Sequence, residues 1–170
     1  NLFYSQLFNE MMEKLPLRND LPIYCLLDEF GNMNIPKFSS IITTIRKYKV
    51  SISIIIQNIN QLNEIYSVNK AKTILDGGIA SKLIFSGADL DLASNLEKMF
   101  GQTRKLEKTA KGEYVYENVN VMSISEIRTM KDDEALFVYS NKKPLKLKIK
   151  PYYKDFMFNG LSKINPYKIA

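Results

Sequence analysis

Hydrophobic and polar residues alternate in blocks along this chain, and the blocks predict helices and strands in a regular order. Residues 2–15 space their apolar side chains three and four apart, which is the pattern of a helix face, and Pro16 ends this block. Residues 23–27 and 50–56 are apolar almost throughout, which is typical of strands buried on both faces. A helix at residues 37–47 is expected between these two strands.

The alternation continues to the carboxyl end. Further helices are expected at residues 61–75, with a break near Ser67, and at residues 89–100; a third strand is expected between them at 79–85. A hairpin within 102–121, a capped helix from Ser123 and two last strands at 135–139 and 145–149 complete the series. This order predicts an α/β fold with a mainly parallel central sheet and antiparallel strands at its carboxyl-terminal side.

Two adjacent carboxylates, Asp28 and Glu29, follow the first predicted strand. Open α/β sheets bind ligands at the carboxyl ends of their strands. An apolar strand that ends in two acids is the Walker B pattern of P-loop ATPases, in which the first acid holds Mg²⁺ and the second polarises the attacking water. The alternative is a strand followed by an ordinary polar turn.

The phosphate-binding half of a nucleotide site is absent from the sequence. A P-loop needs the pattern Gly-x-x-x-x-Gly-Lys-Ser/Thr, but no two of the seven glycines stand five apart and none precedes a lysine. The chain begins at Asn1 and not at a methionine. We therefore expect residues 1–150 to be the second half of a RecA-like P-loop ATPase domain, from Walker B onward. ATP and Mg²⁺ would need the upstream P-loop, and the chain alone would be inactive.

The composition narrows the classes of function. The chain has 170 residues, of which 45% are hydrophobic and 25% charged, as in ordinary globular domains. One cysteine and no histidine exclude a disulfide framework, a zinc site of the usual kind and a histidine-activated nucleophile. No apolar run is long enough to span a bilayer, and the start carries no signal-peptide pattern. These features predict a soluble fragment in a reducing compartment, with any membrane anchor upstream.

Positive charge is concentrated near the carboxyl end. Residues 131–170 contain nine lysines and four acids, a net charge of +5 out of +6 for the whole chain. One interpretation is a surface for nucleic acid or another polyanion. The alternative is a lysine-rich, solvated edge strand, which resists edge-to-edge pairing. Residues 151–170 are expected to form an irregular basic tail, and the candidate phosphate-contacting residues are Lys142, Lys143, Lys146, Lys148 and Lys150.

A longer stretch around the two acids resembles a known family. The chain contains, in order, Asp28-Glu29-Phe30-Gly31-Asn32, Ile35-Pro36, residues 42–46 (ITTIR) and residues 50–62 (VSISIIIQNINQL). This order resembles type IV secretion coupling proteins, the TraG family of conjugation ATPases, and the similarity covers most of residues 23–153. It implies a homo-hexameric ATPase at the cytoplasmic face of the bacterial plasma membrane. Such an ATPase couples relaxase-bound DNA of the relaxosome to the proteins of a type IV secretion channel.

The resemblance also implies roles for single residues. Asp28 matches the aspartate that supports Mg²⁺, and Glu29 the glutamate that orients or deprotonates water. Gln57 matches a sensor glutamine that contacts the γ-phosphate or the water; without the resemblance it is a strand-end side chain bonded to nearby backbone. Because adjacent strand residues point to opposite faces, Asp28 and Glu29 can share a site only if the chain turns, which Phe30-Gly31 would allow. Arg46 matches a residue proposed to reach the next subunit's nucleotide site; the alternative is compensation of a helix dipole.

Two other functions stay open. The chain could belong to another hexameric DNA pump of the same superfamily, such as a chromosome-segregation translocase, and an inserted helical domain upstream would argue against that. It could also be a non-catalytic docking scaffold. The presence of Asp28, Glu29 and Gln57 together argues against a scaffold.

Overall fold

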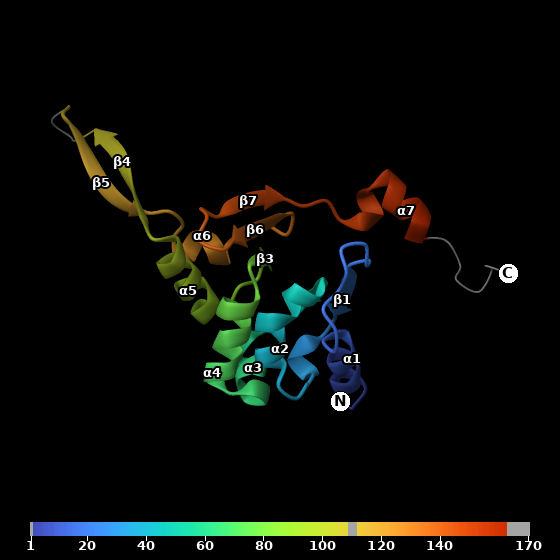
Figure 1. The fold of residues 1–170 in the computed structure, drawn as a ribbon. Coiled ribbons are helices and arrows are strands. Elements are labelled where there is room, and N and C mark those ends of the chain that lie inside the picture. Colours follow the sequence, from blue (N-terminus) through green and yellow to red (C-terminus); the bar gives the residue numbers. More distant parts are fainter. Residues whose placement is uncertain (1, 109–111, 163–170) are drawn as a thin grey trace. The chain divides into compact units, whose positions relative to one another are not determined.

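The structure is a computed structural model that describes residues 2–108 and 112–162. The chain divides into two compact units, Asn1–Ala80 and Ser81–Ala170, a boundary that the sequence pattern did not predict. Each unit has a hydrophobic core of its own. Figure 1 labels the helices and strands of the chain. The two units are therefore described separately.

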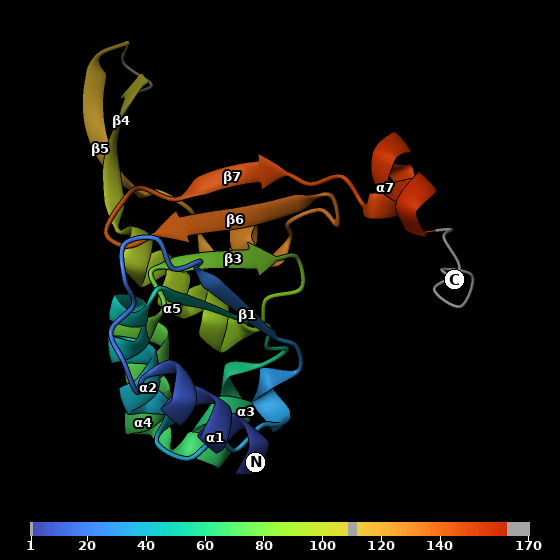
Figure 2. The ribbon, with the colours of Figure 1, turned by 45° about the vertical axis from the view of Figure 1, so that its right-hand side comes forward.

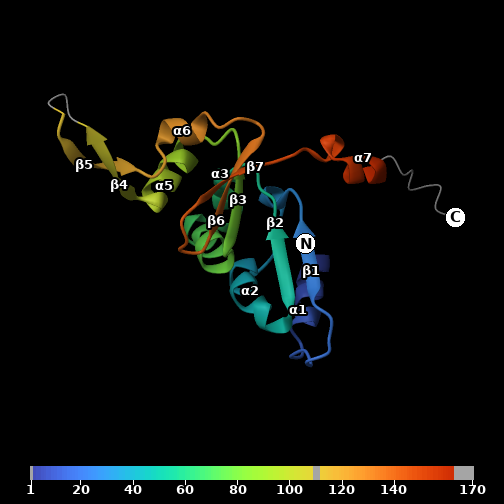
Figure 3. The same cartoon turned by 90° about the horizontal axis from the view of Figure 1, so that it is seen from above.

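The amino-terminal unit combines a pair of parallel strands with short helices. Strands β1 (Ile23–Leu27) and β2 (Val50–Ile54) pair in parallel, with Ile23 opposite Val50 and Leu27 opposite Ile54 (Figure 3). The helical elements are α1 (Leu2–Met11), η1 (Phe30–Asn32), α2 (Phe38–Thr44), η2 (Ile45–Tyr48), α3 (Ile59–Tyr66), α4 (Val68–Lys72) and the π-helix η3 (Thr73–Gly78). The predicted break between α3 and α4 is confirmed at Ser67, whose φ is 68°.

The prediction that β1 is buried on both faces is wrong for the described residues. Leu27 is buried and Cys25 half-buried, whereas Tyr24 and Leu26, on the other face, are 78% and 69% exposed. Strand β2 behaves in the same way, because its serines alternate with the apolar residues that face the core. Local sequence shows that a strand is apolar but does not show how many faces its neighbours cover.

An aromatic cluster forms the centre of this unit's core. The ring of Phe30 lies 4.5 Å from that of Phe38 and stacks on Tyr66 at 5.6 Å with an interplanar angle of 12°. Phe8 of α1 packs against Phe38 at 6.0 Å. Phe8, Phe30 and Phe38 are fully buried. The cluster joins α1, α2 and α3 to the residue that follows the two acids.

The carboxyl-terminal unit contains an antiparallel sheet, two packed helices and a separate hairpin (Figure 2). The sheet has the order β3 (Ser81–Phe85), β6 (Glu134–Tyr139) and β7 (Leu145–Lys148), so β3 pairs with β6 and not with a parallel neighbour. The hairpin consists of β4 (Gln102–Lys108) and β5 (Tyr114–Asn120). A parallel pair followed by antiparallel strands confirms the predicted α/β fold class.

Helices α5 and α6 of this unit each begin at a side-chain cap. Asp89 accepts from the backbone of Leu92 and caps α5 (Leu90–Phe100), which ends at Gly101. Ser123 and Glu126 form the predicted capping box of α6 (Ile124–Arg128). The Ser123 amide and hydroxyl both donate to the Glu126 carboxylate, and these hydrogen bonds lower the pKa of Glu126.

The segment after Pro151 is not irregular as predicted. It contains the 3₁₀ turn η4 (Tyr152–Lys154) and helix α7 (Phe156–Ser162), and residues 163–170 lie outside the described part of the chain. In residues 2–108 and 112–162, every helix is too short or too polar to cross a bilayer.

Candidate functional site

The structure places Asp28, Glu29 and Gln57 at one edge of the β1–β2 sheet. Backbone pairing continues past the strands, because the amide of Ile55 donates to the Leu27 carbonyl and the amide of Phe30 donates to the Ile55 carbonyl, both at 2.9 Å. The carboxyl end of β1 is thus fixed beside the segment that leads from β2 to Gln57. All three candidate side chains are exposed.

The predicted turn at Phe30-Gly31 is confirmed, and the backbone leaves the strand at Glu29, the residue before it: the Asn32 amide donates to the Glu29 carbonyl at 2.9 Å. Glu29 has φ 50° and ψ 36°, in the left-handed region, and its amide donates to Oδ1 of Asp28 at 2.9 Å. This backbone costs about 1–2 kcal/mol for a residue with a Cβ. The turn breaks the strand's alternation between the two acids, which was the geometric condition for both to serve one site.

Buried contacts just after the turn hold it in place. Phe30, next in the chain, is fully buried in the aromatic cluster. Gly31 lies so close to Gln61 of α3 that a Cβ there would collide with the Gln61 side chain. Burial of Phe30 and the fit of Gly31 offset the strain at Glu29, since neither contact can form unless the chain turns there.

Tyr66 fixes the segment that leads from the turn into α2. Its hydroxyl donates to the carbonyl of Met33 at 2.6 Å and accepts from the amide of Ile35 at 2.9 Å. Tyr66 itself is buried, and burial raises its pKa. The structure thus shows that Tyr66 supports the segment after the turn.

Arg46 lies away from the acids of its own chain. It is exposed in η2, before the amino end of β2, whereas the acids follow the carboxyl end of β1. The five residues of β2 separate the two ends by about 16 Å. The structure therefore does not bring Arg46 together with Asp28, Glu29 and Gln57 in one chain.

Lys49 anchors the turn that carries Arg46, a role for which the sequence gave no signal. Its amide donates to the Arg46 carbonyl at 3.2 Å. Its Nζ donates to the carbonyls of Leu17, Arg18 and Asp20 at 2.7, 2.8 and 3.0 Å. Three hydrogen bonds from one ammonium group tie this turn to the loop before β1.

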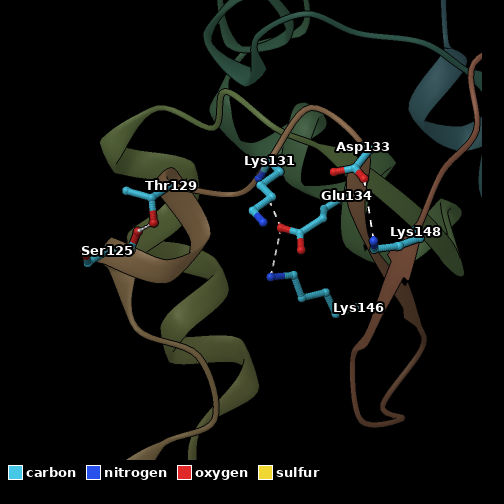
Figure 4. Close-up of polar contacts among 7 residues, drawn as sticks. All are labelled: Ser125, Thr129, Lys131, Asp133, Glu134, Lys146 and Lys148. Carbon is cyan, nitrogen blue, oxygen red and sulfur yellow. Dashed lines mark hydrogen bonds and ion pairs between the residues drawn. The ribbon is translucent and has the colours of Figure 1, made fainter.

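Three of the five candidate DNA-contacting lysines have acidic partners. Lys146 lies 2.9 Å from Glu134 and Lys148 3.9 Å from Asp133 (Figure 4), and Lys150 lies 3.4 Å from Asp155. Hydrogen bonding from Lys146 lowers the pKa of Glu134. Lys146 and Lys148 belong to β7, which is bonded only to β6 in the described residues, and their pairs favour the solvated-edge alternative for this strand. Lys142 and Lys143 lie exposed in the β6–β7 turn.

The acids fit one part of a magnesium–nucleotide site. In the described residues, no group of three or more His, Cys, Asp or Glu side chains could hold a metal ion alone. Magnesium in nucleotide sites is commonly held by one or two carboxylates together with the phosphates. Asp28, an exposed carboxylate at a strand end, suits that arrangement, and the phosphate-binding part is absent from the sequence.

Comparison with known proteins identifies the family. Residues 22–132 match the family described as "TraM recognition site of TraD and TraG". The chain belongs to this family. The match contains the turn at Glu29, Gln57, Arg46 and the whole hairpin, and it ends before the lysines of β7. Among curated proteins, no sequence matches the chain.

Solved structures show the same fold at low sequence identity. The bacterial conjugative coupling protein TrwBdeltaN70, in an unbound form, superposes with a TM-score of 0.72 at 18% identity, over 87% of this chain and 36% of that one. TrwB in complex with ADP and Mg²⁺ gives a TM-score of 0.68 at 18% identity, over 87% and 35%. VirB4 of Thermoanaerobacter pseudethanolicus gives 0.54 at 17% identity, over 98% and 37%. This family member thus spans about a third of each of these structures.

Proposed function

We propose that this TraG-family chain is the Walker B and sensor half of an ATPase that transfers DNA during bacterial conjugation. The observation that carries the proposal is the left-handed turn at Glu29, which lets two adjacent acids serve the edge to which Gln57 also belongs. The TrwB structures with nucleotides support it, because their matching region has this fold. The full-length protein would supply the P-loop and assemble as a hexamer.

Each residue then has a defined task. Bound Mg²⁺ and ATP would supply the phosphoryl group and the neutralisation of its charge. Asp28 would support the ion through its carboxylate. Glu29, directed by the turn, would orient or deprotonate water, and Gln57 would hydrogen-bond the γ-phosphate or that water. Both side chains are exposed and so accessible to these ligands.

Arg46 would act on the nucleotide site of the neighbouring subunit. The separation between Arg46 and the acids of its own chain supports this assignment. An arginine finger contributes roughly 10³–10⁵ in rate by stabilising charge on the transferring phosphoryl group. Its guanidinium fork suits a phosphate in a way that a lysine ammonium does not.

Partner binding is a second candidate function, favoured by the family's description as a recognition site for TraM. In that case the chain would recruit a relaxosome protein. The two functions are compatible in one protein, because docking and hydrolysis need different surfaces. At the membrane, the same protein would pass the DNA to the channel.

The decisive experiment uses the full-length protein with Glu29→Gln, a substitution that keeps size and removes the base. We expect ATP hydrolysis to fall by about 10²–10⁴-fold with ATP still bound, and DNA transfer between cells to fall with it. Glu64→Gln, at an exposed position of α3, is the matched control and should retain hydrolysis. Unchanged hydrolysis in Glu29→Gln would refute the assignment. Normal DNA transfer by a hydrolysis-deficient Glu29→Gln protein would favour the docking function alone.

A mixing experiment tests Arg46. Parents that carry Arg46→Ala or Glu29→Gln should each be inactive, and their mixture should regain part of the hydrolysis, because one interface then pairs an intact Glu29 with an intact Arg46. Arg46→Lys should reduce turnover with little effect on ATP affinity. If co-assembled mixtures regain no ATP hydrolysis, Arg46 either acts in its own subunit or only stabilises the fold.

A further inference from the structure

The β4–β5 hairpin extends away from α5 and α6 in all three ribbon views (Figures 1–3). In the described part of the chain, its strands pair only with each other. The base is fixed: Nδ2 of Asn120 donates to Glu97 of α5 at 2.8 Å, and the amide of Val121 donates to the Gly101 carbonyl at 3.0 Å. Both faces of the ribbon beyond that base are open to solvent.

The strand register assigns each side chain to one of the two faces. Directly opposed residues of an antiparallel pair share a face, and successive residues alternate. Arg104 stands opposite Asn118, Leu106 opposite Tyr116, and Lys108 opposite Tyr114. Two contacts agree with this register: Nε2 of Gln102 donates to Asn120 at 3.2 Å, and Nζ of Lys108 lies 5.9 Å from the centre of the Tyr114 ring.

One face therefore gathers cations, aromatic rings and an amide, with no acid. We call it the basic-aromatic face, and it consists of Arg104, Leu106, Lys108, Tyr114, Tyr116 and Asn118. Leu106, Tyr114 and Tyr116 are 51%, 67% and 71% exposed. Rings this exposed contribute little to the core, so their burial cannot explain their presence.

The opposite face has a different character. It carries Thr103, Lys105, Glu107, Val115 and Glu117. Its lysine is paired with Glu107 at 3.1 Å, and the two glutamates leave this face net negative. The two sides of one ribbon thus differ in charge and in aromatic content.

We propose that the basic-aromatic face binds single-stranded DNA. Proteins hold single strands by combining cations that follow the phosphates with aromatic rings on which bases stack. Tyr114 and Tyr116 are two residues apart on one strand, so their rings stand about 7 Å from each other along it. Arg104 and Lys108 lie on the adjacent strand, about 14 Å apart, where they can contact the phosphates of the same DNA.

The exposed rings favour a single strand over a duplex. A ring can stack on a base only where the base is unpaired and unstacked, whereas a duplex offers the ribbon phosphates and base edges. The choice of DNA as the nucleic acid rests on the proposed function. The location of the contact rests on the hairpin alone.

The test measures binding of fluorescein-labelled oligothymidylate to the 170-residue chain by anisotropy, over a range of salt concentrations. We expect Tyr116→Ala to weaken binding by about 5- to 150-fold with an unchanged salt slope, and Tyr116→Phe to keep it. Arg104→Gln with Lys108→Gln should reduce the slope of log K against log salt by about 1.4. A duplex of the same length should bind more weakly than the single strand.

Two variants of the opposite face serve as matched controls. Lys105→Gln removes a cation and should leave the slope unchanged. Val115→Ala removes an apolar strand side chain and should leave affinity unchanged. The proposal is overturned if the chain binds no DNA, if duplex is preferred, or if Val115→Ala loses as much affinity as Tyr116→Ala. ATP hydrolysis by the full-length protein is measured independently, so failure here would leave the Walker B assignment standing.

Discussion

The left-handed backbone at Glu29 predicts that glycine stabilises this position more than alanine does. The side chain is exposed, so its removal loses little packing. Alanine retains the Cβ that makes φ 50° unfavourable, at about 1–2 kcal/mol. Glycine avoids that cost, but it also increases the conformational entropy of the unfolded chain, which lowers the free energy of unfolding by about 0.4–1 kcal/mol. The net expectation is that Glu29→Gly is about 1 kcal/mol more stable than Glu29→Ala.

Glu64 offers a control site at which alanine, and not glycine, should give the more stable chain. It is an exposed residue within helix α3, where glycine is about 1 kcal/mol less favourable than alanine. Comparing the glycine–alanine difference at the two sites removes general effects of losing a glutamate. The two differences should stand about 2 kcal/mol apart.

Urea denaturation of the four variants, followed by circular dichroism, gives the free energies of unfolding. If glycine and alanine at position 29 are equally stable, or if alanine is better, the chain does not turn at Glu29 as described. The geometric reason for assigning both acids to one site would then be lost. If Glu29→Gly is more stable than the parent chain and the full-length Glu29→Gly protein does not hydrolyse ATP, then Glu29 is kept for its function at a cost in stability.

Three further substitutions test the supports around the two cores. Tyr66→Phe leaves two backbone groups without their partner and should cost about 2–3 kcal/mol in urea denaturation, whereas Tyr24→Phe, at an exposed position, should be neutral. Gly78→Ala should destabilise the chain by about 1–3 kcal/mol, because its Cβ would lie 2.5 Å from an isoleucine side chain of α2. Ser123→Ala removes a helix cap, at about 1 kcal/mol. The capping box lowers the pKa of Glu126 in the folded chain below the unfolded value near 4.5. The ionised carboxylate therefore contributes to the stability of the folded chain above that pH, and this contribution is lost as the pH falls through the folded pKa. Thermal melting points measured between neutral and acidic pH should therefore vary less in Ser123→Ala than in the parent; an equal variation would contradict this.

Local signals in the sequence predicted the elements well. The apolar run of β2, the capping box at Ser123 and the break at Ser67 each act within a few residues, and each appears in the structure. Pairing and burial depend on distant residues and could not be predicted in this way. The antiparallel partner of β3 lies some fifty residues further along the chain, and the exposure of Tyr24 depends on which elements cover β1.

The candidate site was predicted in part for the same reason. The two acids were identifiable because a strand end is a local feature, whereas Gln57 was identified only through the family resemblance, and the roles of all three stay predictions. The turn at Phe30-Gly31 was predicted, but the left-handed backbone at Glu29 was not, because it depends on the burial of Phe30 against Phe38 and Tyr66. The hairpin within residues 102–121 was predicted and is confirmed, but the chemical difference between its two faces was not predicted. This difference becomes apparent only when the register pairs Tyr114 and Tyr116 with Lys108 and Leu106.

Helix α3 connects the segment that carries Gln57 rigidly to the turn that follows Glu29. Its capping residue, Asn58, directly follows Gln57; its first turn presses Gln61 against Gly31; and its last residue, Tyr66, holds the segment after the turn. A helix transmits displacement along its length with little bending. If Gln57 contacts the nucleotide as proposed, a shift of Gln57 would therefore be passed to the backbone beyond Glu29, and both ends of the proposed site would respond together.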